Sequence, residues 1–125
     1  MKRLSVEHIK QIHSFVIAET GGLEGIRDEG ALESAVNTPF QTFDSTSLYK
    51  TIEAKAARLA YSIVKNHAFI DGNKRTGIMA MLLFLELNGA GRDCTDEELI
   101  HIGLGLADGS MDDQDLLNWI LEESF

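Results

Sequence analysis

Ten consecutive residues in the middle of the chain, 67–76, concentrate groups that can do chemistry. His67 supplies an imidazole that accepts a proton near neutral pH, and Asp71 supplies a hard carboxylate oxygen suited to Mg²⁺. Two cations, Lys74 and Arg75, follow directly. A base, a metal-binding carboxylate and two cations favour transfer of a phosphoryl or nucleotidyl group to a hydroxyl, because that reaction depends on positioning and charge stabilisation.

Gly72 and Asn73 form a turn at which a strongly apolar segment begins. If that segment is helical, its first N–H groups have no intrahelical partner and, with the positive end of the helix dipole, they form an anion site. Cations are disfavoured at a helix N-terminus, so Lys74 and Arg75 together indicate that an anion normally binds there. Arg75 can hold two phosphate oxygens, whereas Lys74 acts as a point charge.

An ordinary structural corner between two helices is the alternative explanation of the same residues. In that case Asp71 or Asn73 caps the second helix, and the two cations form a solvated surface. His67 taken alone is then a structural histidine. Spacing by itself favours this structural explanation over a phosphate site.

The segments on both sides of this stretch have helical periodicity. Residues 48–66 place apolar side chains at helical spacing without glycine or proline, and their alanines would let a neighbouring helix approach closely. Residues 73–88 are apolar nearly all round, which predicts a central, buried helix. Between them, Phe69 is expected to pack into the core and fix the loop.

The other segments predict further helices and one hairpin. Ser5, Asp28, Thr95 and Asp112 stand where each of four helices would begin, as N-cap residues do. Residues 40–47 alternate apolar and polar side chains before turn residues, which predicts a short hairpin. The fold class expected is therefore all-α, a single domain over residues 1–125 around one buried helix, with a small β-hairpin flap.

A glycine-rich connector, residues 21–30, joins the first two helices. It lacks the Gly-Lys-Ser/Thr ending of a phosphate-binding P-loop, and no strand precedes it. We expect it to be an ordinary connector, packed by Leu23 and Ile26. Pro39 is expected to end the second helix.

The charge balance bears on the partners. With 20 acidic and 11 basic residues the formal charge is −9, which repels nucleic acid and suits a basic protein partner. A small cationic island around Lys74 suggests an anionic ligand. His8, His13 and His101 lack the spacing of zinc ligands, so we expect no zinc site and structural or surface roles for them.

The same sequence predicts a cytoplasmic protein without a membrane partner. The longest apolar run is far too short to span a bilayer, and no signal peptide is visible at the start. Cys94 is a single cysteine and forms no internal disulfide, which fits a reducing compartment.

The stretch His-x-Phe-x-Asp-Gly-Asn-Lys-Arg, at residues 67–75, resembles the signature of the Fic/death-on-curing (Fido) family, in its death-on-curing branch. The Gly-Gly-Leu-x-Gly sequence at 21–25 is similar to that branch too. The resemblance implies a Fic-like helical domain in which His67 deprotonates a target hydroxyl. It implies that Asp71 binds the Mg²⁺ that bridges the phosphates of ATP.

By the same resemblance, Gly72 and Asn73 match the anion-hole positions and Arg75 the arginine that contacts phosphate. A flap within residues 40–47 would align the target chain by strand pairing. Two positions depart from the AMP-transferring members, which have glycine at the place of Lys74 and a second arginine at the place of Ile78. An isoleucine cannot hold a distal phosphate, and Lys74 adds a positive charge where the reacting phosphate would lie.

The Lys74 and Ile78 pairing is that of death-on-curing proteins. The resemblance therefore implies transfer of the γ-phosphate of ATP to a hydroxyl of elongation factor Tu, which blocks translation. It also implies a toxin restrained by a cognate antitoxin that covers the active-site cleft. An inhibitory Ser/Thr-x-x-x-Glu-Gly/Asn helix is absent from residues 5–9 and 121–125, so restraint is expected in trans. AMP or other nucleotidyl transfer is the alternative reaction, and a non-catalytic nucleotide- or partner-binding module is a third reading.

Overall fold

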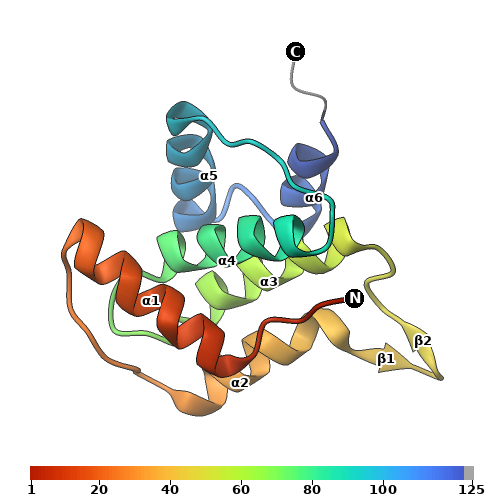
Figure 1. Ribbon diagram of the computed structural model, residues 1–125, viewed down its shortest axis with the longest axis horizontal. Coiled ribbons are helices and arrows are strands. Elements are labelled where there is room, and N and C mark those ends of the chain that lie inside the picture. Colours follow the sequence, from red (N-terminus) through yellow and green to blue (C-terminus); the bar gives the residue numbers. More distant parts are fainter. Residues whose placement is uncertain (123–125) are drawn as a thin grey trace.

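A computed structural model describes residues 1–122, in which helices pack on both sides of a central helix pair (Figure 1). The helices are α1 (Val6–Thr20), α2 (Glu29–Asn37), α3 (Ile52–Asn66), α4 (Asn73–Leu87), α5 (Asp96–Asp108) and α6 (Asp113–Leu121), with a 3-10 turn η1 (Thr38–Phe40) after α2. The strands β1 (Thr42–Phe43) and β2 (Thr46–Ser47) pair antiparallel. The expected all-α fold with a hairpin flap is confirmed. Residues 123–125, part of the segment in which no inhibitory sequence was found, lie outside the described residues.

The helix starts lie where the cap residues predict them. At α1 the Ser5 hydroxyl accepts a hydrogen bond from the His8 backbone N–H at 3.2 Å, and at α2 the Asp28 carboxylate accepts one from Ala31 at 3.0 Å. Thr95 and Asp112 open α5 and α6 through reciprocal capping boxes. Local side-chain chemistry therefore defines these helix boundaries.

Helices α3 and α4 form the centre of the molecule and carry the loop between them. Helix α3 packs against α2, α4, α5 and α6. The backbones of the pair approach closely where Gly77 of α4 faces Ala60 of α3: a Cβ atom on Gly77 would lie 3.0 Å from the Ala60 carbonyl oxygen. The expectation that small residues of α3 permit a close helix contact is confirmed.

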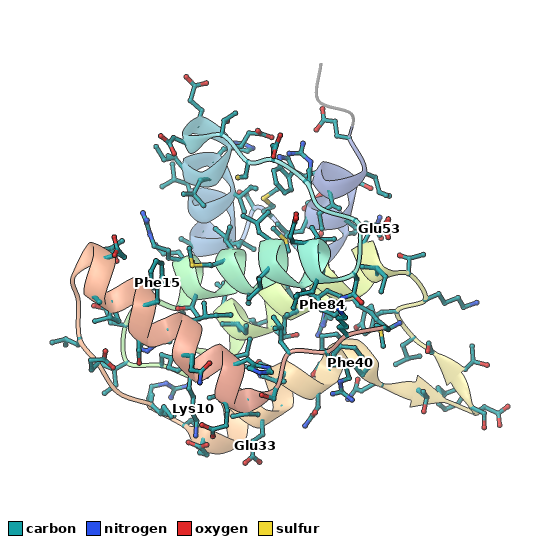
Figure 2. All side chains as sticks on the ribbon, viewed as in Figure 1. Lys10, Phe15, Glu33, Phe40, Glu53 and Phe84 are labelled. Carbon is teal, nitrogen blue, oxygen red and sulfur yellow. The ribbon has the colours of Figure 1, made fainter. Side chains whose placement is uncertain are left out.

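The expectation of a central helix over residues 73–88 is confirmed, although one face of α4 is open. Ile78, Met81 and Phe84 are buried, and Phe84 meets the ring of Phe40 edge-on (Figure 2). Three other apolar side chains stay 38–39% exposed: Met79, Leu83 and Leu87. Among the described residues they line a groove beside α1 instead of entering the core.

The hairpin delays the start of α3. Helix α3 begins at Ile52 and not at residue 48. The Leu48 N–H donates to the Gln41 carbonyl at 3.0 Å and continues the hairpin pairing, and the Thr51 hydroxyl caps the helix by accepting from the Ala54 N–H at 3.0 Å. Asp44 and Ser45 both have positive φ, 52° and 65°, as a type I′ hairpin turn requires. The expected hairpin within residues 40–47 is confirmed.

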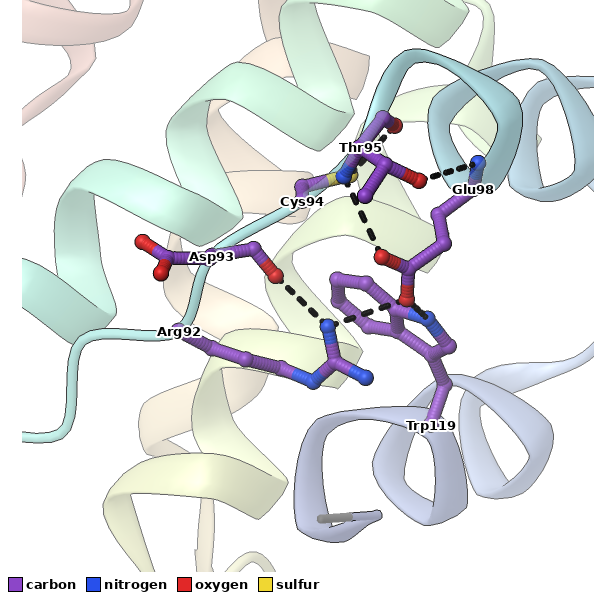
Figure 3. Close-up of polar contacts among 6 residues, drawn as sticks. All are labelled: Arg92, Asp93, Cys94, Thr95, Glu98 and Trp119. Carbon is purple, nitrogen blue, oxygen red and sulfur yellow. Dashed lines mark hydrogen bonds and ion pairs between the residues drawn. The ribbon is translucent and has the colours of Figure 1, made fainter. Parts of the chain in front are cut away.

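A polar cluster ties the first turn of α5 to α6 (Figure 3). The guanidinium of Arg92 stacks 3.7 Å from the centre of the Trp119 ring. The Glu98 carboxylate accepts hydrogen bonds from Arg92 at 3.1 Å and from the indole N–H of Trp119 at 2.7 Å. This cluster therefore holds α5, whose C-terminal end faces the loop between α3 and α4.

Within residues 1–122 we find no helix that combines the length and the apolar character needed to cross a membrane.

Candidate active site

His67 ends α3 in a left-handed backbone conformation, with φ 46° and ψ 49°. This conformation is uncommon for a residue with a side chain and is sustained only where the surroundings hold it. Arg27 does so: its guanidinium donates hydrogen bonds to the His67 carbonyl at 2.6 Å and to the Asn66 carbonyl at 2.9 Å. The imidazole of His67 is exposed to solvent and lines a cleft beside the start of α4.

The connector between α1 and α2 pairs with the loop that carries the site. Ile26 and Phe69 form an antiparallel β-bridge, in which the Arg27 N–H donates to the Ala68 carbonyl at 2.8 Å and the Ile70 N–H to the Gly25 carbonyl at 3.1 Å. Phe69 is 1% exposed, so its expected role as a core anchor is confirmed. The prediction that Leu23 packs the connector is wrong, since its side chain is 64% exposed. Leu23 instead contacts the loop through its backbone N–H, which donates to the Asp71 carboxylate.

Asp71 receives two backbone hydrogen bonds. Its Oδ1 accepts from the Gly72 N–H at 2.9 Å, and its Oδ2 accepts from the Leu23 N–H at 3.1 Å. Its carbonyl oxygen lies 2.7 Å from Nε2 of His13, a residue 3% exposed. The carboxylate stays at the surface, and each oxygen keeps one lone pair for a further partner.

The start of α4 has no side-chain cap. Gly72 is its N-cap residue with φ 76°, and no side chain of the described residues accepts a hydrogen bond from the first-turn N–H groups of α4. The Asn73 amide is used elsewhere, since it donates to the Phe69 carbonyl at 2.9 Å and accepts from the Phe69 N–H at 3.0 Å. The alternative in which Asp71 or Asn73 caps α4 is therefore wrong, and the first-turn N–H groups remain available to an anion.

Two clefts flank this helix start. The first, of about 500 Å³, is lined by His67, Asp71, Gly72, Asn73 and Lys74 on one side and by the end of α5 on the other. The second, of about 340 Å³, lies between the ends of α1, α4 and α5 and is lined by Asp71 to Lys74 together with Arg75 and Ile78. The structure brings the predicted site residues to one turn, but places His67 and Arg75 in different clefts.

Charges of both signs surround the turn: two cations lie at the start of α4, and the Asp108 carboxylate lies on the facing wall of the first cleft. Lys74 and Arg75 are exposed, and neither forms an ion pair with another residue of the described chain. On the facing wall, hydrogen bonds from the Ser110 side chain and backbone lower the pKa of Asp108 below its usual value. Asp108 therefore stays ionised and makes that wall negative.

The turn offers too few side-chain ligands to enclose a metal ion by itself, but it could hold one together with the phosphates of a substrate. Residues 1–122 contain no group of three His, Cys, Asp or Glu side chains that would enclose a metal ion. Asp71 alone offers a carboxylate with free lone pairs beside an uncapped helix start. Mg²⁺ is commonly held in this way, through one or two carboxylates with the other positions filled by water and substrate phosphates.

Sequence reasoning missed four contributors to the site. Arg27 and His13 gave no local signal, since their partners lie 40 and 58 positions further along the chain. The Leu23 N–H is a backbone group and leaves no mark in a sequence. Asp108, at the end of α5, enters the cleft only through packing.

A helical domain with an exposed histidine at the end of one helix and an uncapped start on the next is the arrangement expected of a Fic-type transferase. A family model described as the Fic/DOC family matches residues 3–85, and the chain belongs to this family. The resemblance deduced from residues 67–75 is thereby confirmed.

Two characterised relatives are similar to the chain. One, named Toxin Doc, from Mycolicibacterium smegmatis, is 44% identical over 69 residues, which are 55% of this chain and 53% of the relative. The match thus spans about half of that relative. The other, named Protein kinase doc, from Escherichia phage P1, is 30% identical over 111 residues, which are 89% of this chain and 86% of the relative.

Proposed function

We propose that this protein is a single-domain toxin that transfers the γ-phosphate of ATP to a hydroxyl of a target protein. The uncapped start of α4 beside His67 is the observation that carries the proposal, because it joins an anion site to a base. The relative named Protein kinase doc, matched over most of both chains, supports phosphate as the group transferred. By family resemblance the target is elongation factor Tu, so that translation is blocked.

Ile78 argues for phosphate transfer over AMP transfer. Its side chain is 2% exposed and lines the cleft that contains Arg75. A buried aliphatic group offers no donor to a phosphate oxygen, whereas the arginine typical of AMP-transferring members would. Lys74 lines both clefts and supplies its charge where α4 begins.

Each residue of the turn has its own role in the proposed reaction. His67 accepts the proton of the target hydroxyl as its oxygen bonds to the γ-phosphorus, and the bond from that phosphorus to the β–γ bridging oxygen breaks to release ADP. The first-turn N–H groups of α4, with Lys74 and Arg75, offset the charge on the phosphate oxygens. Little covalent chemistry is asked of the protein, which mainly positions and stabilises.

Asp71 is the residue that would hold Mg²⁺ together with phosphate oxygens. The ion, when bound, neutralises phosphate charge and aligns the transferred group. The Leu23 and Gly72 N–H groups fix the Asp71 carboxylate for this purpose.

Isotope labelling tests the reaction. Purified protein is incubated with elongation factor Tu and Mg²⁺, in parallel with ATP labelled at the γ- or at the α-phosphorus. The proposal expects label on the target from γ-labelled ATP alone, and none with His67→Ala. Label from α-labelled ATP would show nucleotidyl transfer instead, and label from neither would leave a binding module.

We also propose that the antitoxin docks in the apolar groove between α1 and α4. The groove, of about 860 Å³, is lined by exposed Phe15, Met79 and Leu83, and Lys2 and Arg3 stand at its rim. A patch of this kind fits an amphipathic helix with acidic residues beside its apolar face. Because α1 and α4 also line the second cleft, a helix laid along them would reach the Arg75 end of the site.

A charge placed in the groove tests this docking surface. Leu83→Glu should weaken antitoxin binding in isothermal titration calorimetry, since it buries a carboxylate in the apolar contact. Its rate of target phosphorylation without antitoxin should match that of the wild type, because Leu83 lies outside both clefts. Unchanged antitoxin affinity would place the antitoxin elsewhere.

A further inference from the structure

His13 is a buried residue of α1 that contacts the loop between α3 and α4. Its ring stacks on that of Phe69 with 3.9 Å between ring centres and 4° between ring planes. Its Nε2 lies 2.7 Å from the carbonyl oxygen of Asp71, an atom that only accepts hydrogen bonds. Nε2 therefore carries the hydrogen and donates it, which fixes the backbone of the Asp71 turn.

The connector after α1 holds the side chain of the same residue. The Leu23 N–H donates to Oδ2 of Asp71 at 3.1 Å. Gly22, with φ 117°, lies so close that a Cβ atom there would stand 2.6 Å from this oxygen. The neighbouring Gly21 has a similar positive φ of 78°, yet a Cβ atom on it would meet nothing within 4 Å. Of the two glycines, therefore, only Gly22 stands where a side chain would collide with Asp71.

From this geometry we infer that His13, Gly22 and Leu23 are positioning residues for the metal-binding carboxylate. His13 fixes the backbone of Asp71, and the Gly22–Leu23 backbone sets the direction of its side chain. The inference rests on the proposed function, in which Asp71 holds Mg²⁺ beside the phosphates of ATP. It assigns a role to the glycine-rich connector that goes beyond linking two helices.

The physical reason is that a single carboxylate at an exposed turn would otherwise rotate among several rotamers. Groups that hold a metal ligand by hydrogen bonds fix its orientation, and their loss commonly lowers metal affinity about 10- to 100-fold. Here the carboxylate is the single such ligand at the turn, so its direction decides where the ion lies. The stacked Phe69 ring keeps His13 itself from turning.

Metal binding can be measured without turnover. Mn²⁺ is titrated into the protein with the non-hydrolysable ATP analogue adenylyl imidodiphosphate, and bound ion is followed by electron paramagnetic resonance. We expect Gly22→Ala and His13→Phe to lower Mn²⁺ affinity about 10- to 100-fold. His13→Phe keeps an aromatic ring against Phe69 but removes the donor, and His13→Gln, which restores a donor, should recover part of the affinity.

The matched control is Gly21→Ala. It also places a side chain at a positive φ, but its Cβ atom would meet nothing within 4 Å, so it should leave Mn²⁺ affinity unchanged. Equal affinities for Gly21→Ala and Gly22→Ala would overturn the inference. In wild-type protein, Mg²⁺ with the analogue should shift the amide resonance of Leu23 more than that of Glu24, and an unmoved Leu23 signal would overturn it too.

Asp71→Asn separates this inference from the proposed function. If Asp71→Asn retains Mn²⁺ binding, the metal role of Asp71 fails and the inference falls with it. If Asp71→Asn abolishes binding while Gly22→Ala and His13→Phe bind as the wild type does, only the positioning role is wrong.

Discussion

The guanidinium of Arg27 holds the backbone of His67 from across the connector: its Nε lies 2.6 Å from the His67 carbonyl oxygen. A second bond, from Nη2 to the Asn66 carbonyl at 2.9 Å, completes the contact. Carbonyl groups at the end of a helix have no intrahelical partner, so Arg27 acts as a C-terminal cap of α3. It does so at the residue proposed as the base.

We therefore predict that Arg27→Ala lowers both stability and activity. Loss of two hydrogen bonds from a charged donor should reduce the free energy of unfolding by about 1–2 kcal/mol, a range set by partial rehydration of exposed carbonyls. Urea unfolding measures this, and γ-phosphate transfer should slow in parallel because the His67 backbone is released. Arg27→Lys, which keeps one donor, should fall between. A variant with wild-type stability would show that water replaces the cap.

The left-handed backbone conformation of His67 should lower the stability of the folded protein. Both His67→Ala and His67→Gly remove the imidazole, and we expect neither to transfer phosphate. Glycine adopts the left-handed conformation freely, so the free energy of unfolding of His67→Gly should exceed that of His67→Ala by about 1 kcal/mol. Thermal unfolding with radiolabel transfer measures both effects. Transfer by either variant at the wild-type rate would remove His67 from the mechanism.

The close contact of α3 with α4 predicts opposite effects for two helical glycines. Gly77→Ala should lower the free energy of unfolding by about 1–3 kcal/mol, because its Cβ atom would press on Ala60 and Val64. Gly103→Ala in α5 meets nothing within 4 Å and should raise it by up to about 1 kcal/mol through helix propensity. Chemical denaturation of both variants tests this, and similar values would show that α4 shifts freely against α3.

Glu98 should make stability depend on acidic pH. The backbone hydrogen bond from Thr95 and the side-chain bond from Trp119 lower the pKa of Glu98 below its ordinary value of 4.5. A carboxyl whose pKa is lower in the folded state contributes stability above its unfolded pKa and loses it as pH falls through the folded one. Glu98→Gln should therefore be less stable than wild type at pH 7, with the difference shrinking below pH 4.5. Urea unfolding across pH 3–7 measures it, and a constant difference would exclude the linkage.

Much of the fold follows from local chemistry. The caps at Ser5, Asp28, Thr95 and Asp112 and the periodicity between them predict the helices, because caps and apolar faces act over three or four neighbouring residues. The hairpin was predicted from alternation and turn residues. The start of α3 lies four residues later than expected, because Leu48 pairs with Gln41 across the hairpin, a bond that a residue's own neighbours do not reveal. The cap at Thr51, by contrast, is a local signal.

The order of residues 67–75 by itself identifies the family, and it names the residues for which we propose a role in the reaction. Only the tertiary structure decided how those groups are held and separated. It divides the turn between two clefts, with His67 facing one and Arg75 the other, and it brings His13, Leu23 and Arg27 to the loop from far along the chain. These contacts join residues 40 to 58 positions apart, through backbone atoms that every residue shares, so no local pattern of side chains encodes them.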